Sequence, residues 1–276
     1  MTTTDQQRQK ELIRARFTKT VDAFADYAVS YRAQFADLLA SLVSAQPSES
    51  VVDLACGPGT LALQFARKVR RVHAVDLTPA MLARARSTAE TDGLRNLSFT
   101  LGDAQSLPFA TGALDISVTS YSLHHVPDPA RMIQEMARVV KRDGRVGIID
   151  IVVPEDPARA EIANRIEIMR DPSHTRTLAR SEFEKLLAAA GLRILASEVH
   201  ELPRSFDHWM HVAGWQRGDR AYIETRRLME STMADDRAGF HPQFAPPDTD
   251  APHESRNEAP DINMVNTALF IAAGKN

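Results

Sequence analysis

Short apolar runs rich in β-branched residues alternate along the chain with longer stretches that repeat at helical spacing. Five such runs predict buried strands, at residues 49–55, 72–77, 97–103, 114–120 and 145–152. Helix start signals at Thr60, Thr78 and Pro129 open the stretches between them. This alternation of strand and helix predicts a parallel, doubly wound sheet.

The flanking segments extend this pattern. The chain is predicted to begin with an N-terminal helical cover at 1–46, followed by a core at 47–202. A helical insert with a mobile loop follows at 203–262, and the last strand of the core lies at 263–276. The loop, 241–261, is rich in proline and acid and poor in apolar residues. With one more strand at 193–202, the fold class expected is α/β. It comprises a Rossmann-like, seven-stranded, mostly parallel sheet with helices on both faces.

Composition narrows the class of protein. With 43% hydrophobic and 25% charged residues in 276, the chain has a globular composition. A formal net charge of -3 gives no basic face for nucleic acid. The single cysteine, Cys56, excludes an internal disulfide and a cysteine-based zinc cluster. The polar N-terminus and the absence of an apolar run of about 20 residues predict a cytoplasmic protein without membrane insertion.

The turn after the first strand, VVDLACGPGT, places Gly57 and Gly59 where a backbone can approach a ligand, with Ala55 where a first glycine often stands. Nicotinamide and phosphate binders share such a turn, so the glycines alone do not define the ligand. Asp76 ends the second strand, where an acid binds ribose hydroxyls, and Asp103 ends the third, where it can meet an adenine amine. Acids after successive strands suit a cationic, phosphate-free nucleoside.

In this order, these motifs resemble the class I S-adenosylmethionine-dependent methyltransferases, in the group that includes the ubiquinone and menaquinone C-methyltransferases. The resemblance runs through VVDLACGPGT, VHAVDLTPAML, GDAQSLPF and SYSLHHVPDPARMIQEMARVVKRDGRV to the last strand. The family pattern implies S-adenosylmethionine as cofactor and S-adenosylhomocysteine as product. The one departure is Ala55 in place of a first glycine.

The resemblance also implies roles for individual residues. The turn formed by Ala55, Cys56, Gly57 and Gly59 would hold the methionine part of the cofactor. Asp76 would bind the ribose, Leu77 and Met81 would flank the adenine, and Asp103 with Ala104 would recognise the adenine edge. Ser120 and Tyr121 would line the floor near the methyl group, and Tyr27 would belong to the cover. Asp53, inside the first strand, is expected to orient the turn or to accept from the ligand's ammonium group.

Methyl transfer from a sulfonium has a neutral leaving group, so a base is needed only for an acceptor that enters protonated. His125 is the candidate catalytic residue, with ring packing or hydrogen bonding as the alternative. Tyr121 and His125 are also candidate substrate residues. His174 and Arg176 are further candidates in a loop, and Trp209 either walls the acceptor pocket or packs the insert. No metal site is expected, because His124 and His125 are adjacent and adjacent residues of a regular element diverge.

The predicted activity is methyl transfer to carbon or oxygen, in preference to nitrogen, of a small hydrophobic or aromatic acceptor. The alternatives are a cofactor-binding relative without methyl transfer and a nicotinamide-dependent oxidoreductase, although the Tyr-x-x-x-Lys pair of many dehydrogenases is absent: Tyr121 is followed four residues later by His125. No nucleic-acid partner is expected, and the chain is expected to be a monomer or a homodimer.

Overall fold

The computed structural model describes residues 2–246 and 259–275, except for the side chains of residues 3 and 26–34. Within these residues one sheet has the strand order β3-β2-β1-β4-β5-β8-β6, and β7 pairs with β8 at its edge. The strands are β1 Ser50–Leu54, β2 Arg71–Asp76, β3 Leu97–Leu101, β4 Leu114–Ser120, β5 Val140–Val152, β6 Leu192–Ser205, β7 Gln243–Phe244 and β8 Ile262–Lys275. Strands β1 to β5 are parallel, and β8 is antiparallel to both β5 and β6.

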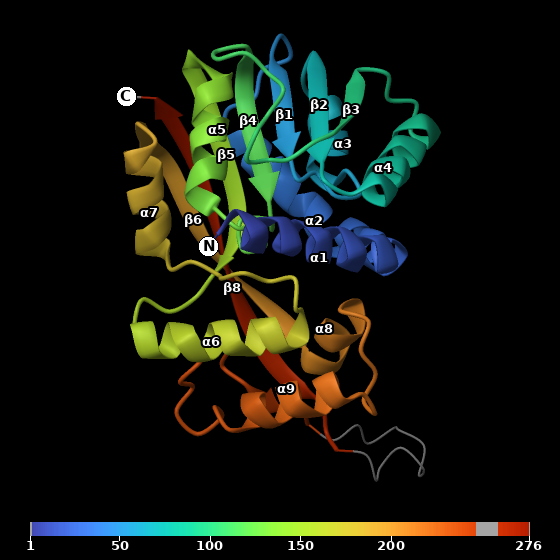
Figure 1. The fold of residues 1–276 in the computed structure, drawn as a ribbon, viewed down its shortest axis with the longest axis vertical. Coiled ribbons are helices and arrows are strands. Elements are labelled where there is room, and N and C mark those ends of the chain that lie inside the picture. The colour runs from blue at the N-terminus through green and yellow to red at the C-terminus, as the bar shows by residue number, and fades with distance from the viewer. Residues whose placement is uncertain (1, 247–258, 276) are drawn as a thin grey trace.

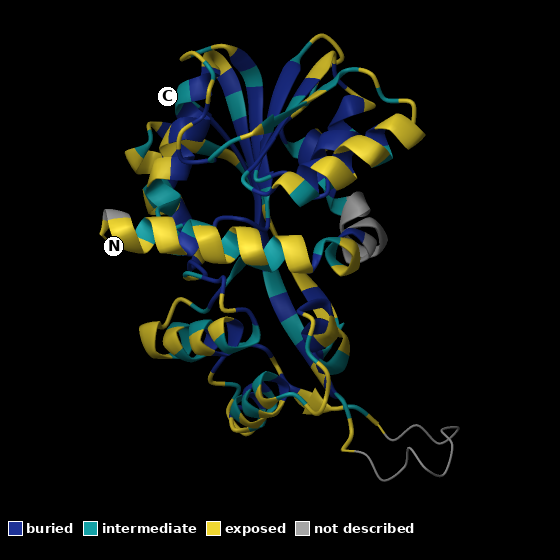
Figure 2. Ribbon diagram, turned by 45° about the vertical axis from the view of Figure 1, so that its right-hand side comes forward, coloured by how far each residue is buried: buried dark blue, intermediate teal, exposed yellow. Residues whose placement is uncertain are grey.

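The predicted fold class is confirmed, with the two-residue β7 added to the seven predicted strands. The helices are α1 Thr3–Lys19, α2 Val21–Leu42, α3 Thr60–Ala66, α4 Pro79–Thr91, α5 Pro129–Val139, α6 Pro157–Arg170, α7 Arg180–Ala189, α8 Phe206–Val212 and α9 Arg220–Glu230. Helices α5 and α7 pack on one face of the sheet, and α2 and α3 on the other. The central strands are therefore buried on both faces, as Figure 2 shows.

Strands β6 and β8 continue beyond the core sheet and carry a second, smaller body (Figure 1). There α6, α8 and α9 pack around a separate apolar cluster that includes Phe206, Trp209 and Tyr222. Helix α6 lies in the range predicted for the core, 47–202, yet it packs with the insert. The predicted domain ranges stay a prediction, and the part of the loop at 247–258 lies outside the described residues. No helix in the described part of the chain is long and apolar enough to cross a membrane.

The predicted N-terminal helical region is two helices, with the break at Thr20. Helix α1 runs across the ends of the core strands, between the two bodies (Figure 1). Its outer face is exposed (Figure 2), and Lys10, Ile13 and Phe17 face a pocket at the strand ends. The amino-terminal segment therefore covers the site that the sheet forms.

Gly147 on β5 lets α2 pack closely against the sheet. A Cβ atom there would lie 2.9 Å from Val43 Cγ1 and 3.2 Å from Leu39 Cδ1. We expect Gly147→Ala to lower the free energy of unfolding by about 1–3 kcal/mol, because the added methyl group overpacks the core. Gly218→Ala is the matched control, since a Cβ atom at Gly218 meets nothing within 4 Å. Equal unfolding midpoints of the two variants in urea would contradict this account.

Candidate active site

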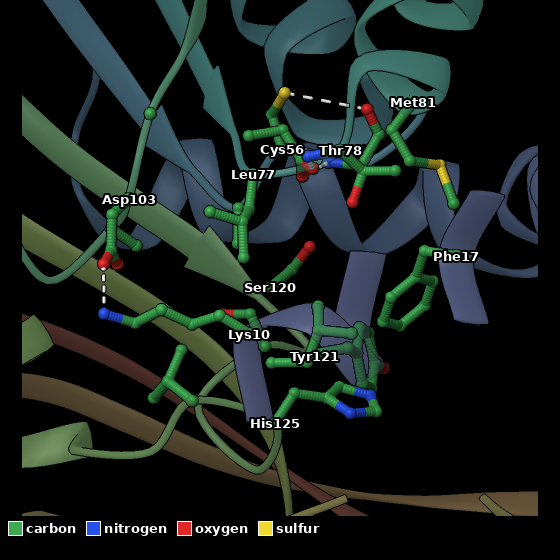
Figure 3. Close-up of a pocket in the computed structure, with 18 of the residues that line it drawn as sticks. Lys10, Phe17, Cys56, Leu77, Thr78, Met81, Asp103, Ser120, Tyr121 and His125 are labelled. Carbon is green, nitrogen blue, oxygen red and sulfur yellow. Dashed lines mark hydrogen bonds and ion pairs between the residues drawn. The ribbon is translucent and has the colours of Figure 1, made fainter. Parts of the chain in front are cut away.

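A pocket of about 840 Å³ lies at the carboxyl ends of β1, β2, β3 and β4, under α1. This is the place where open parallel sheets bind ligands. We call it the strand-end pocket; its lining comprises Lys10, Ile13, Phe17, Phe24, Ala55, Cys56, Gly57, Pro58, Thr60, Asp76, Leu77, Thr78, Met81, Gly102, Asp103, Ala104, Gln105, Ser120, Tyr121, Ser122, His125, Val126 and Pro127. Figure 3 shows Asp103 and Cys56 at its upper side and His125 at its lower side.

The glycine turn that follows β1 forms one wall of this pocket. Gly57 has a φ of 53°, and a Cβ atom there would meet nothing within 4 Å, so backbone conformation is what favours glycine. Gly59 does not line the pocket. A Cβ atom at Gly59 would lie 3.0 Å from Ala85 Cβ, so this glycine permits α4 to pack against the turn. Ala55 has a φ of 51° and lines the pocket, as predicted for a small residue.

Asp76, at the end of β2, holds the turn in place. Its carboxylate accepts one hydrogen bond from the Gly57 amide at 2.8 Å and another from the Thr78 amide at 2.7 Å. Burial raises the pKa of Asp76, and the two backbone amides oppose that rise. A buried carboxylate that lines the pocket is thus fixed where the sequence predicts a partner for ribose hydroxyls.

Asp53 lies beneath the turn, outside the pocket lining. One of its oxygens accepts a hydrogen bond from the Ala62 amide at 3.0 Å, and the other has no hydrogen-bond partner among the described residues. Burial raises the pKa of Asp53 well above its usual value. The geometry matches the orienting role expected for this residue and places it away from the ammonium role.

The remaining predicted cofactor residues meet in the strand-end pocket. They are Cys56, Leu77, Met81, Asp103, Ala104 and Ser120. Tyr27 lies outside the residues whose side chains are described. Burial raises the pKa of the Cys56 thiol well above its usual value, which disfavours a thiolate nucleophile.

Residues of α1 complete the pocket. The Lys10 ammonium forms an ion pair with Asp103 at 2.7 Å (Figure 3). Burial alone would raise the pKa of Asp103, but the hydrogen bonds from Lys10 and the Gln105 amide lower it. Phe17 packs edge-on against the His125 ring, with centroids 5.1 Å apart. Helical spacing at Lys10 predicts only a helix, so no sequence signal marked its ion pair, whereas Phe17 lies in an aromatic stripe of the predicted helical cover.

A second pocket, of about 620 Å³, adjoins the first between the two bodies. We call it the polar pocket; it is lined by Arg16, Phe17, Thr20, Phe24, Tyr121, His124, His125, Ile151, Glu167, Arg170, Asp171, His174, Arg204, Trp209, Val212, Ala213 and Asn266. Phe17, Phe24, Tyr121 and His125 line both pockets, so the two meet there. The predicted substrate residues Tyr121, His174 and Trp209 are therefore brought together.

Arg176 is the predicted substrate residue that the structure places elsewhere. Its guanidinium is exposed and forms an ion pair with Glu182 at 2.7 Å, at the start of α7. Arg176 therefore lies outside both pockets, and its contact with substrate stays a prediction. Three other arginines, Arg16, Arg170 and Arg204, line the polar pocket instead.

Three imidazoles gather in the polar pocket, at His124, His125 and His174. Their ring centroids are 4.4 to 4.6 Å apart. The expectation that adjacent histidines diverge does not hold, because β4 ends at Ser120 and Tyr121 has a φ of 51°, so both histidines lie in an irregular loop. Burial, reinforced by His124, lowers the pKa of His125 to about 3 and lowers that of His174 well below its usual value.

Comparisons with known proteins identify relatives of this chain. A family model described as a methyltransferase domain matches residues 51–144. An uncharacterized methyltransferase of Bacillus subtilis, YcgJ, is 33% identical over 72% of this chain and 78% of the relative. The solved structure of YcgJ has a TM-score of 0.76 and 27% identity, covering 87% of this chain and 98% of that one. A demethylmenaquinone methyltransferase of Protochlamydia amoebophila is 31% identical over 44% of this chain and 52% of the relative.

The fold places the strand-end pocket at the sheet's carboxyl edge, where open parallel sheets bind ligands. The chain belongs to the class I S-adenosylmethionine-dependent methyltransferases, as the motifs predicted.

The ion pair between Lys10 and Asp103 ties the α1 cover to the core. Removing it in Lys10→Ala should speed cofactor dissociation about fivefold, because a partly buried pair contributes about 1 kcal/mol. Stopped-flow fluorescence of S-adenosylhomocysteine release would measure this rate. Lys19→Ala is the control, since Lys19 is exposed at the end of α1. Equal release rates for the two variants would exclude an anchoring role for Lys10.

Proposed function

We propose that S-adenosylmethionine lies in the strand-end pocket with its methyl group at the junction of the two pockets, and that the acceptor lies in the polar pocket. The observation that carries this proposal is the lining that the two pockets share, which comprises Phe17, Phe24, Tyr121 and His125. A group bound in one pocket meets a group bound in the other beside these four side chains. The reaction proposed is transfer of the methyl group to an oxygen or carbon of a small acceptor.

The lining of the polar pocket refines the acceptor class. Aromatic side chains from Phe17, Tyr121 and Trp209 suit a flat or apolar body. Arg170 lies over the Trp209 ring, with its guanidinium carbon 4.4 Å from the ring centroid. Two further arginines and two carboxylates share the lining. We therefore propose an acceptor with an aromatic or apolar body and an ionisable oxygen, in place of a purely hydrophobic one.

Methyl transfer proceeds by in-line attack of the acceptor on the methyl carbon. The carbon–sulfur bond breaks, its electron pair stays on sulfur, and neutral S-adenosylhomocysteine results, so no acid is needed. Positioning two reactants in adjoining, partly enclosed pockets supplies much of the acceleration. An acceptor hydroxyl must first lose its proton, and the histidines at the junction are the groups placed to promote that loss.

The cofactor assignment predicts the ligands that the chain binds. Calorimetry should show binding of S-adenosylmethionine and S-adenosylhomocysteine and none of NAD. Asp76→Asn should weaken both interactions at least tenfold, because the neutral amide loses the charge held by the Gly57 and Thr78 amides. Binding of NAD alone would overturn the proposed function. Cofactor binding without methyl transfer to any acceptor in a broad panel would favour a non-methylating relative.

The acceptor assignment predicts how two loop residues differ. Transfer of labelled methyl to a panel of small phenols, enols and carboxylic acids would identify an acceptor. With that acceptor, His174→Ala should lower kcat/KM about tenfold or more, since His174 lines the polar pocket. Arg176→Ala, two residues away, should stay within about twofold because Arg176 is exposed and paired with Glu182. Equal losses in the two variants would place the acceptor elsewhere.

A further inference from the structure

We propose that His124, His125 and His174 together bind one divalent transition-metal ion of the zinc class, at the junction of the polar pocket with the strand-end pocket. The existence of this site does not depend on methyl transfer, whereas its role in catalysis rests on the proposed function. No family motif in the sequence indicates it, and the adjacency of two of the histidines argues against it until the loop geometry is known.

The first observation is convergence. One nitrogen from each ring can be chosen so that all three lie within 4.8 Å of one another. Nitrogen ligands of a tetrahedral zinc ion lie about 2.0–2.1 Å from the metal and hence roughly 3.4 Å apart. Small rotations of buried side chains would close the remaining difference. The rings come from two segments, the loop after β4 and the loop before α7, which the Thr175 amide joins by donating to the His124 carbonyl at 2.8 Å.

The second observation concerns the ring nitrogens that already have a hydrogen-bond partner. His124 Nδ1 lies 2.5 Å from Asp150 Oδ1, and His125 Nδ1 lies 3.1 Å from the Ser173 carbonyl oxygen. A carboxylate and a carbonyl only accept, so each of these Nδ1 atoms carries a proton, and Nε2 is the nitrogen of each ring that can offer a lone pair. Metal-bound histidines almost always donate their second N–H to a carboxylate or a backbone carbonyl in this way.

His174 completes the same arrangement from the other side. Its Nε2 lies 3.9 Å from Glu167 Oε2, so a carboxylate flanks that nitrogen. Its Nδ1 is buried and has no hydrogen-bond partner among the described residues. A buried imidazole nitrogen without a partner is costly, and a metal ion would satisfy it. Each of the three rings thus has one nitrogen beside an acceptor and one left over.

The charges around the cluster are compatible with a cation. Glu167 and Asp171 line the polar pocket, and Asp150 supports His124 from behind. The arginines Arg16, Arg170 and Arg204 line the same pocket. Three acids and three arginines balance, so a divalent ion together with an anionic acceptor leaves the pocket near neutrality. Imidazole ligands favour Zn²⁺, Co²⁺ or Ni²⁺ over Mg²⁺ or Ca²⁺, which prefer oxygen.

The role inferred for the metal is to hold the reacting oxygen of the acceptor. Three protein ligands leave a fourth tetrahedral position, and a bound acceptor oxygen there loses its proton more readily. The proton passes to solvent water, the ionised acceptor attacks the methyl carbon, and the electron pair of the carbon–sulfur bond stays on sulfur. The histidines would then act as ligands, and the metal would replace His125 as the agent that ionises the acceptor.

The experiment measures metal binding without cofactor or acceptor. The full chain, freed of any histidine tag and stripped with a chelator, is titrated with Zn²⁺ against a chromophoric chelator and with Co²⁺ by visible absorption. We expect one ion per chain, a tetrahedral cobalt spectrum, and affinity at least tenfold lower for His124→Ala and His174→Ala. His211→Ala is the matched control, because His211 is exposed at the end of α8. Mg²⁺ should not compete.

Two outcomes would overturn the inference. One is no stoichiometric binding of Zn²⁺ or Co²⁺ at micromolar concentration, and the other is equal affinity in the cluster variants and in His211→Ala. S-adenosylhomocysteine binding by each variant reports an intact core, and His174→Gln replaces His174→Ala if the smaller side chain prevents folding. Cofactor binding is measured separately from metal binding. Absent metal binding with retained S-adenosylhomocysteine binding would overturn this inference alone, whereas absent S-adenosylhomocysteine binding would overturn the proposed function.

Discussion

The site depends on one buried carboxylate, that of Asp76, which joins two successive strands of the sheet at their ligand-facing ends. Its two backbone hydrogen bonds connect the end of β2 to the glycine turn after β1 and to the residue before α4. Burying an acid is costly unless its oxygens are satisfied, and here amides of the turn satisfy them. The turn therefore keeps its left-handed residues, and the pocket under α1 keeps its shape.

The elements that the sequence predicted are those set by local pattern. Strands β1 to β5 are short apolar runs, and the turn at Gly57 requires a backbone conformation that glycine tolerates. Ordered motifs then placed Asp76 and Asp103 at adjacent strand ends, because parallel strands share one carboxyl edge. The strand-end pocket was accessible to sequence reasoning for these reasons.

The polar pocket could not be predicted in the same way, since its residues converge from distant segments. Arg16, Arg204 and Asn266 meet only because β6 and β8 extend beyond the core sheet and position the second body. Helix α6, which supplies Glu167 and Arg170, carries a weak amphipathic signal. The residue type of Arg176 suits an anionic substrate group, but its guanidinium forms an ion pair with Glu182. Which partner an arginine takes is determined by the packed structure and cannot be deduced from its sequence position.

In the proposed function, the two pockets divide the binding of donor and acceptor between the two bodies. The family model matches residues 51–144, which span β1 to the middle of β5 and contain most of the cofactor turn and strand ends. The polar pocket draws most of its charged residues from later segments, including Glu167 and Arg204. Under the proposed function, the family pattern specifies the methyl donor, and side chains outside that pattern recognise the acceptor. His125 lines both pockets, so in that proposal it links the donor site to the acceptor site.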